Sequence, residues 1–348
     1  MQEYFDLQAH NTFKLSARAR YFCAITDVQE LRDALQFARA RNLPLMVLGG
    51  GSNVLFRKDY PGVIVHMTNR GIDIVAETAE AVWVRAASGE SWHGFVEYCL
   101  HAGLHGLENL ALIPGCVGAA PIQNIGAYGV EVKELITDVE VLDAVTGVIE
   151  TLTCTQCEFG YRDSIFKHNL HRRKIILSVT FRLHRSPCIN LGYAALAQAL
   201  SGIADPTPQQ VFDAVCAIRR SKLPDPTVLG NAGSFFKNPV INREAFAKVL
   251  QDWPDLPSFP VAVDNDRNSV SNWVKVPAAW LIEKTGWKGR KFGQAGVYQQ
   301  QPLVLVNHGD ASAADILALA EQIMFTVAQQ FGIQLELEVQ WIPPRSSA

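Results

Sequence analysis

The sequence has little charge and almost no surplus of either sign. Of its 348 residues, 31 are lysine or arginine and 34 are aspartate or glutamate, so the formal net charge is −3 and the charged fraction is 19%. Proteins that bind nucleic acid or anionic membranes electrostatically carry a basic excess. We therefore expect neither partner. Disorder as the main state is also excluded, because 48% of the residues are hydrophobic and can bury a core.

The sequence also lacks a run that reads as a membrane span. The best candidate, residues 109–130, is free of charge but contains two prolines and four glycines. A helix facing lipid would not carry so many helix breakers. At the amino terminus, Glu3 and Asp6 interrupt any apolar stretch, so no signal peptide is visible. We expect a cytoplasmic protein.

Cysteine and histidine lack the spacings of metal sites. The seven cysteines are odd in number and scattered, which is typical of free thiols in a cytoplasmic chain. Cys154 and Cys157 form a lone CxxC pair, and the nine histidines show no HExxH grouping. The sequence predicts no metal site.

The first half of the chain contains an alternation of strand and helix patterns. Residues 21–25 are a short apolar strand, and Thr26 caps the next helix, with Gln29 completing a capping box. Residues 43–48 are predicted to be a buried strand that runs into Gly49, giving a β-α-β unit. Further strands are predicted at 62–67, 72–75, 82–87, 139–142 and 175–183, with a helix near 91–102.

The second half follows a change of composition at residues 206–208. Thr207 and Pro208 open a helix that ends near Lys222. A helix is predicted at 277–284, and another runs from Ser312, with Asp315 in its first turn, to about residue 331. Residues 251–272 are predicted to be a long loop. Residues 333–342 alternate strictly between apolar and polar, which predicts a strand. Together these patterns predict an α+β fold.

A glycine-rich turn, GGGSN, follows the second predicted strand and consists of Gly49, Gly50, Gly51, Ser52 and Asn53. Glycine lets the backbone approach a ligand closely, and the freed N–H groups can form a nest for phosphate oxygens. The turn is no dinucleotide fingerprint, because Val54 occupies the position of the third glycine. A plain tight turn is the alternative interpretation.

Residues 113–129 combine a charge-free backbone with side-chain amides and two prolines. Small residues and free main-chain groups suit a large, flat cofactor, and a buried structural loop is the alternative. Further on, Arg162 stands between Tyr161 and Asp163. A guanidinium is the usual partner of a carboxylate or phosphate, although a surface pair with Asp163 would explain it as well.

Two further segments carry candidate acids. Small residues precede Ser234, so a ligand can reach its hydroxyl, and without a base beside it this serine suits a proton donor better than a nucleophile. A serine in a tight turn is the alternative. Glu336 and Glu338 lie on the polar face of the predicted last strand. That face is either solvated or lines a pocket, where desolvation would raise a carboxyl pKa.

These segments together resemble the UDP-N-acetylenolpyruvoylglucosamine reductase family, flavoenzymes of cell-wall precursor synthesis. The matching stretches are GGGSN at 49–53, IPGCVGAAPIQNIGAYG at 113–129, FGYRDSIFK at 159–167, RRSKLPDP at 219–226, GNAGSFFKNP at 230–239 and LELEV at 335–339. They occur in the family's order and span nearly the whole chain. The residues at 161–164 and the long loop after Pro254 resemble the subgroup with a substrate loop.

The resemblance implies a two-part FAD-binding unit of the vanillyl-alcohol-oxidase (PCMH) type and a C-terminal α+β substrate-binding domain. We expect the two FAD-binding subdomains at residues 1–67 and 68–205, the substrate domain at 206–332, and the strand of 333–348 packed back near the first. The residues implied to bind FAD, non-covalently, are Gly49, Gly50, Gly51, Ser52, Asn53, Cys116, Asn124, Ile125, Gly126, Ala127 and Arg219.

The resemblance also implies a reaction. NADPH reduces FAD, and the flavin then delivers hydride to C3 of the enolpyruvyl ether of UDP-N-acetylglucosamine, while C2 is protonated to give UDP-N-acetylmuramate. By resemblance, Arg162 and Glu338 stabilise the enolate-like charge and Ser234 donates the proton. The residues implied to bind substrate are Tyr161, Tyr193, Lys222 and Asn238, with Lys275, Lys288 and Gln301 toward the uridine and phosphate end.

The chain departs from the family pattern in its loop. In the subgroup, a loop tyrosine closes over the substrate. Here residues 259–263 contain no tyrosine, residues 264–272 look inserted, and Trp273 is the candidate substitute for that tyrosine. Leu337 stands where proline is common. A sugar or lactone oxidase on the same fold is an alternative, although many link a histidine to FAD and none lies near the GGGSN turn. A UDP-sugar binding protein without turnover is another. Because no exposed apolar stripe or heptad is visible, we expect a monomer.

Overall fold

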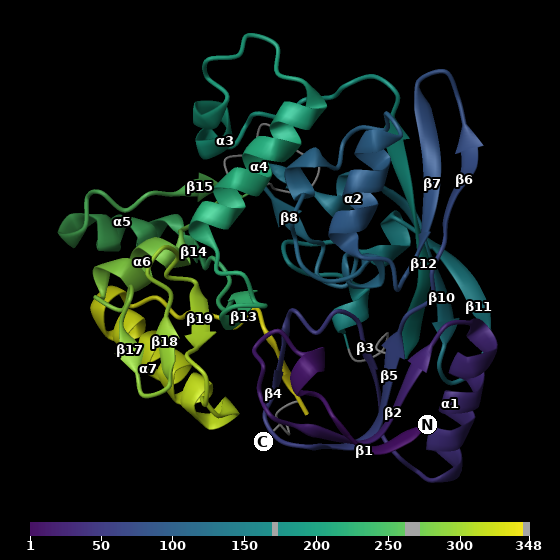
Figure 1. Cartoon of the computed structure of the whole chain (residues 1–348). Coiled ribbons are helices and arrows are strands. Elements are labelled where there is room, and N and C mark those ends of the chain that lie inside the picture. Colours follow the sequence, from purple (N-terminus) through teal and green to yellow (C-terminus); the bar gives the residue numbers. More distant parts are fainter. Residues whose placement is uncertain (169–172, 262–271, 344–348) are drawn as a thin grey trace. The chain divides into compact units, whose positions relative to one another are not determined.

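The computed structural model describes residues 1–168, 173–261 and 272–343, which divide into two compact units (Figure 1). The first unit holds Met1–His10, Arg18–Ser52 and Asp59–Ser221. The second holds Asn11–Ala17, Asn53–Lys58 and the chain from Lys222 onward. The chain therefore passes between the units several times. The subdomain boundaries expected at 67/68 and 205/206 stay predictions.

The first unit begins with a four-stranded sheet. Its order is β1 (Gln2–Asp6), β2 (Arg18–Ile25), β5 (Tyr60–Met67) and β3 (Leu45–Leu48), with β2, β5 and β3 parallel. Helix α1 (Val28–Ala40) buries one stripe, Leu31, Ala34, Leu35 and Ala38, in a core shared with this sheet. The β-α-β prediction is confirmed in outline.

Two details of that prediction are wrong. The helix is capped by Asp27, whose carboxylate accepts the N–H of Glu30, because the Thr26 hydroxyl instead donates to the Glu30 carboxylate. Strand β3 is also not buried: it lies at the sheet edge, and of its residues only Leu48 is buried while Val47 is 37% exposed.

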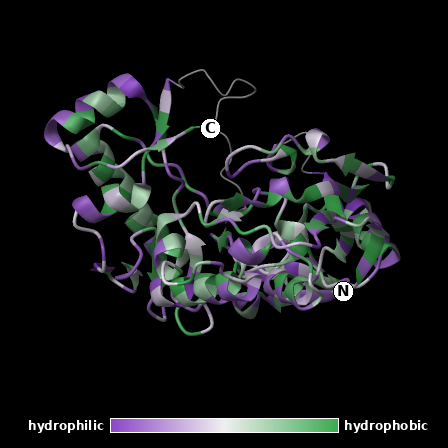
Figure 2. Cartoon of the chain, turned by 90° about the horizontal axis from the view of Figure 1, so that it is seen from above, coloured by the Kyte–Doolittle hydropathy of each residue, from purple (hydrophilic) through white to green (hydrophobic). Residues whose placement is uncertain are grey.

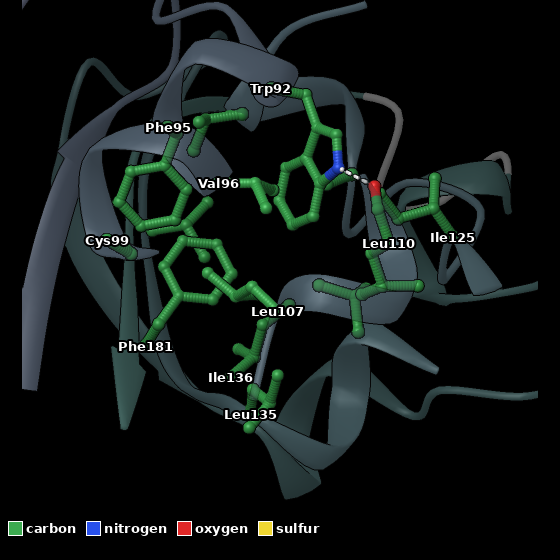
Figure 3. Close-up of a cluster of buried hydrophobic side chains, with 14 of the residues drawn as sticks. Trp92, Phe95, Val96, Cys99, Leu107, Leu110, Ile125, Leu135, Ile136 and Phe181 are labelled. Carbon is green, nitrogen blue, oxygen red and sulfur yellow. Dashed lines mark hydrogen bonds between the residues drawn. The ribbon is translucent and has the colours of Figure 1, made fainter. Parts of the chain in front are cut away.

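A second, antiparallel sheet of the first unit has the order β11 (Ile149–Thr153), β10 (Ile136–Asp143), β12 (Lys174–His184), β7 (Ala81–Ala87) and β6 (Ile72–Glu77). The prediction missed β11. Its core holds the rings of Trp92 and Phe95 from α2 (Trp92–His101) against Phe181 of β12, and Trp92 Nε1 donates to the Leu110 carbonyl at 2.8 Å (Figure 3).

Two more helices and a hairpin complete the first unit. Helix α4 (Pro208–Lys222) packs Val211, Phe212 and Val215 into the same core, and its predicted start at Pro208 is confirmed. The other elements are α3 (Ala194–Ala199), β8 (Gly126–Ala127), β9 (Val130–Glu131) and the short 3-10 helices Gln8–His10, Glu108–Leu110, Val117–Ala119, Val132–Glu134, Thr155–Cys157 and Ile165–Lys167.

The second unit is built on a sheet of order β13 (Gly230–Ser234), β19 (Val304–Asn307), β18 (Ala295–Val297) and β17 (Lys291–Phe292). Helices α6 (Ala278–Lys284) and α7 (Ala313–Phe331) share its core. The predicted start of α7 at Ser312 and its end near residue 331 are confirmed: Ser312 and Asp315 form a capping box, and Gly332 ends the helix at φ 66°. A small sheet has the order β14 (Val240–Asn242), β16 (Trp273–Lys275) and β15 (Phe259–Pro260), beside α5 (Arg243–Asp252). The segment expected to be inserted lies outside the described residues, apart from Asn272.

The expected single strand at 333–342 is wrong. Side chains do alternate, with Leu335 and Val339 buried and Glu336 exposed, but only β20 (Gln340–Ile342) is a strand. The reason is a change of partner. Residues 336–338 pair with residues 235–237, whereas β20 runs parallel to β4 (Val54–Phe56).

No helix within the described ranges is long and apolar enough to cross a bilayer. Hydrophilic and hydrophobic residues alternate along the helices instead (Figure 2).

An aromatic cluster on the first sheet makes stability depend on pH. The rings of Phe5, Phe22, His10 and His66 pack together, with 5.3 Å between the two imidazoles. Burial, helped by the charges of His10 and Arg70, lowers the pKa of His66. The unfolded chain then binds more protons than the folded one, so stability falls as pH drops through about 6.5.

We expect His66→Gln to weaken this pH dependence. The melting temperature of the wild type should fall between pH 7.5 and pH 5, and the variant should lose less over the same range. His101→Gln, at the exposed end of α2, is the matched control and should keep the wild-type slope. Equal slopes for wild type and His66→Gln would contradict the assignment to His66.

Candidate active site

The two glycine-rich segments lie against each other in the first unit. A Cβ on Gly50 would lie 2.8 Å from Gly115 Cα, and one on Gly49 would lie 2.5 Å from Cys116 Sγ. The Ser52 hydroxyl donates to the Pro114 carbonyl at 3.2 Å. Such close backbone approach is possible only with glycine at these positions. The structure therefore builds one cradle from two segments about 65 residues apart.

Cys116 lies within this cradle as a neutral thiol. Burial raises its pKa, and hydrogen bonds from the backbone of Ala119, Gly50 and Gly118 oppose this effect more weakly. All seven cysteines of the chain are free. Burial likewise raises the pKa of Cys157 to about 12, so the CxxC pair is held as thiols.

The predicted cofactor segment, residues 113–129, ends in the hairpin of β8 and β9. Tyr128 and Gly129 form its turn with φ of 49° and 86°, the two positive angles that a tight type I′ hairpin requires. The buried Asn109 holds this turn, because its amide donates to the carbonyl of Tyr128 at 2.8 Å and to that of Asn190 at 2.9 Å. No role was predicted for Asn109 from the sequence.

Arg162 lies in the first unit with an unusual backbone, at φ 54°. Its guanidinium donates to the carbonyl of Gly126 at 2.7 Å and lies 5.6 Å from the ring centre of Tyr161. Asp163, the partner in the alternative surface pair, contacts His168 at 3.2 Å. The structure therefore joins the predicted arginine to the predicted cofactor segment.

A second arginine, Arg219 of α4, is bound to the hairpin. Its Nε donates to the Leu112 carbonyl at 3.1 Å, and its side chain hydrogen-bonds Tyr128. Burial lowers the pKa of this guanidinium and raises that of the Tyr128 phenol. Tyr128 also contacts Tyr193 edge to face, with 5.1 Å between ring centres. Tyr128 was not among the predicted residues, although its place before a turn glycine could have marked it.

Ser234 and Glu338 come together in the second unit. Ser234 ends β13 directly after Gly233, whose φ is 67°. The next residue, Phe235, accepts the N–H of Glu338 at 2.9 Å. Both candidate acids are half-buried. The other glutamate, Glu336, is exposed and pairs with Lys237 at 3.3 Å, which matches the solvated alternative.

Asn53 supports the segment that carries Glu338. Its amide donates to the Glu338 carbonyl at 3.4 Å, and its own carbonyl accepts the N–H of Gln340 at 3.0 Å. Asn53 belongs to the second unit, whereas the preceding residues of the GGGSN turn belong to the first.

The other predicted substrate residues are spread over the second unit. Asn238 Oδ1 accepts the first N–H of α6 at 3.0 Å, and Lys288 pairs with Glu283 at 2.8 Å. Gln301 accepts the N–H of Leu303 at 3.3 Å, Lys275 ends β16, and Lys222 is exposed at the end of α4. Since Arg162 and Tyr193 belong to the first unit, their meeting with these residues stays a prediction.

No group of three or more His, Cys, Asp or Glu side chains that could hold a metal ion occurs within the described residues.

Comparison with known proteins identifies both halves of the chain. Residues 19–153 match an FAD binding domain, and residues 225–342 match the C-terminal domain of UDP-N-acetylenolpyruvoylglucosamine reductase. Reductases of this name from Pseudomonas putida and Paraburkholderia phymatum are 45% and 48% identical to the chain, over 97% and 96% of it and 97% and 95% of their own lengths.

A solved structure of an enzyme with this name is similar in fold to the chain. The UDP-N-acetylenolpyruvylglucosamine reductase (MurB) of Thermus caldophilus aligns with a TM-score of 0.65 at 23% identity, covering 96% of each chain. This likeness supports the fold, and the predicted α+β class with its FAD-binding unit and C-terminal domain is confirmed. From its sequence relatives, the chain belongs to the UDP-N-acetylenolpyruvoylglucosamine reductase family.

Proposed function

We infer that the chain reduces UDP-N-acetylglucosamine enolpyruvate to UDP-N-acetylmuramate with NADPH through bound FAD. The observation that carries this conclusion is 45–48% identity to curated reductases over nearly the whole chain. Bound FAD supplies the chemistry of accepting a hydride from NADPH and passing it to C3 of the enolpyruvyl group. The chain's own residues must bind both substrates, stabilise charge and deliver a proton to C2.

The glycine-rich cradle of the first unit fits FAD. The cradle at Gly49 and Gly50 has no room for a Cβ, so its backbone N–H groups can approach a diphosphate. We propose that the other contacts come from Gly51, Ser52, Asn53, Cys116, Asn124, Ile125, Gly126, Ala127 and Arg219. Binding is proposed to be non-covalent, because no histidine stands in the GGGSN turn or at 113–129.

Three side chains are proposed to act on the substrate. Addition of hydride at C3 places negative charge on C2 and its carboxylate. Arg162 and Glu338 stabilise that charge, and a single missing donor at such a position costs roughly 3 kcal/mol. Glu338 must be protonated to donate rather than repel. Ser234 gives its proton to C2 and recovers one from a neighbour or water.

The remaining residues are proposed to hold the nucleotide ends of the substrates. Tyr193, Lys222 and Asn238 bind the diphosphate, and Tyr161 lies beside Arg162 at the carboxylate. Lys is suited to this task as a mobile point charge. Lys275, Lys288 and Gln301 bind toward the uridine. The activity supplies a peptidoglycan precursor, and we place it in the cytoplasm, as a monomer, in support of cell shape and division.

The test is anaerobic mixing of the yellow protein first with NADPH and then with the enolpyruvyl sugar nucleotide. We expect NADPH to bleach the flavin absorbance and the sugar nucleotide to restore it. Recovery by oxygen alone would favour a sugar or lactone oxidase. Protein that stays colourless after FAD is offered would favour a UDP-sugar binding protein.

Gly50→Ala is expected to weaken FAD binding by about 5- to 150-fold, because overpacking of this kind costs about 1–3 kcal/mol. The new Cβ would lie 2.8 Å from the backbone of Gly115, which cannot move aside as a flexible side chain can. Fluorescence titration of apoprotein with FAD measures the change. Gly202→Ala is the control, because a Cβ there meets open space. Equal affinity in both variants would remove the cradle from the FAD site.

A further inference from the structure

Asn124 is a buried polar side chain of the first unit, and all of its hydrogen-bonding groups have partners within the protein. It is 0% exposed, and its backbone has a positive φ of 43°. Its amide donates to the Gly160 carbonyl at 2.9 Å and to the Glu131 carboxylate at 3.0 Å, and its oxygen accepts the N–H of Lys133 at 3.1 Å. Since both amide hydrogens are used inside the protein, the side chain has no donor left for a ligand.

One of these bonds holds the turn that carries Arg162. Gly160 and Asp163 close this turn with backbone hydrogen bonds of 3.0 and 3.3 Å, and Arg162 lies inside it at φ 54°. A left-handed backbone is unfavourable for arginine, so the turn needs outside support to keep that shape. The Asn124 amide supplies support at the Gly160 carbonyl.

The guanidinium of Arg162 returns to the same segment. It donates to the Gly126 carbonyl at 2.7 Å and contacts the Asn124 carbonyl at 3.5 Å. Asn124 therefore contacts Arg162 in two ways. Its side chain holds the turn that carries the Arg162 backbone, and its main-chain carbonyl lies beside the guanidinium. The Glu131 and Lys133 bonds tie this arrangement to the hairpin of β8 and β9.

We propose that Asn124 is a positioning residue that sets the backbone and the guanidinium of Arg162 for the enolpyruvyl carboxylate. The inference rests on the proposed function of Arg162. The FAD contact proposed for Asn124 is then made by its main chain, and its side chain serves the turn of Arg162. Displacement of a positioned group by about 1 Å can cost about 10²-fold in rate, so the effect should fall on the step that uses Arg162.

Asn124→Asp tests this with almost no change of shape. The aspartate keeps an acceptor for the Lys133 N–H but sets an oxygen against the Gly160 carbonyl in place of a donor. We expect recovery of flavin absorbance with the enolpyruvyl sugar nucleotide to slow by about 10- to 100-fold, with bleaching by NADPH and FAD content close to wild type. Should this variant fail to fold, Asn124→Gly carries the test, because glycine accepts φ 43° without strain.

The control is Asp143→Ala. Asp143 is also buried, and its carboxylate holds the N–H groups of Val145 and Thr146 in a turn after β10. This variant should melt at a lower temperature, with both half-reactions unchanged. A double variant adds a second readout: with Arg162→Ala already present, Asn124→Gly should slow the second half-reaction no further.

Equal slowing of both half-reactions, loss of FAD, or full additivity with Arg162→Ala would overturn the inference. Wild-type rates in the folded Asn124 variants would overturn it too, and would leave the proposed function intact. If the wild type itself is not re-oxidised by the sugar nucleotide, the proposed function fails first and the inference falls with it.

Discussion

Ser234→Ala should slow re-oxidation of the flavin by the enolpyruvyl sugar nucleotide by about 10²- to 10⁴-fold, the usual worth of a positioned general acid. Reduction by NADPH should stay within about twofold of wild type, because hydride transfer from NADPH needs no proton from this residue. Anaerobic stopped-flow absorbance separates the two half-reactions. The expected result is therefore slow re-oxidation with normal reduction, and a general loss of activity would contradict it.

The position of Ser234 supports the proposed role. It ends β13 after a glycine with φ 67°, and the residue that follows it is hydrogen-bonded to Glu338. A hydroxyl is a weak acid, so it can protonate C2 only because the developing carbanion is strongly basic and close. Ser201→Ala, which removes an exposed hydroxyl from the first unit, is the control and should leave both rates unchanged. Equal losses in both half-reactions of Ser234→Ala would remove it from the role.

Local patterns were enough to predict the parts of the fold that local interactions determine. Helix α7 is an example, because its capping box, its apolar stripe and its terminal glycine all lie within or next to the helix. The segment at 333–342 shows the limit. Its alternation correctly indicates which side chains are buried, but strand formation depends on the partner, and the partner changes from residues 235–237 to β4.

The candidate site shows the same division. The residues proposed to act on the substrate, such as Ser234 and Arg162, were predicted from motifs, because each stands in a distinctive string. The hydrogen bonds that support their segments could not be predicted. Asn109 holds a turn 19 positions away, and Asn53 holds the backbone of Glu338 from 285 positions away. Such hydrogen bonds leave no periodic signal in the sequence, so only the structure reveals them.

Arg162→Ala should slow the same half-reaction as Ser234→Ala, by about 10²- to 10³-fold, the range found when one charge-stabilising donor is removed. Arg162→Lys should recover little of this loss. A lysine is a point charge, whereas a guanidinium can hold both oxygens of a carboxylate in a fixed plane. The Gly126 carbonyl already takes one N–H of Arg162, which fixes the direction of the fork. A lysine that kept this bond could not also present two parallel N–H groups to the carboxylate.

A matched control is available for this variant in the same unit. Arg182 on β12 lies 5.6 Å from the ring centre of Trp83, the distance at which Arg162 lies from Tyr161, but it is on an exposed strand position. Arg182→Ala should therefore lose a similar contact with an aromatic ring and keep both half-reactions. FAD content and melting temperature show whether either variant is simply unfolded. If Arg162→Lys restores the wild-type rate, charge alone is sufficient, and the fixed geometry that Arg162 takes from residues 124–126 has no part in the reaction.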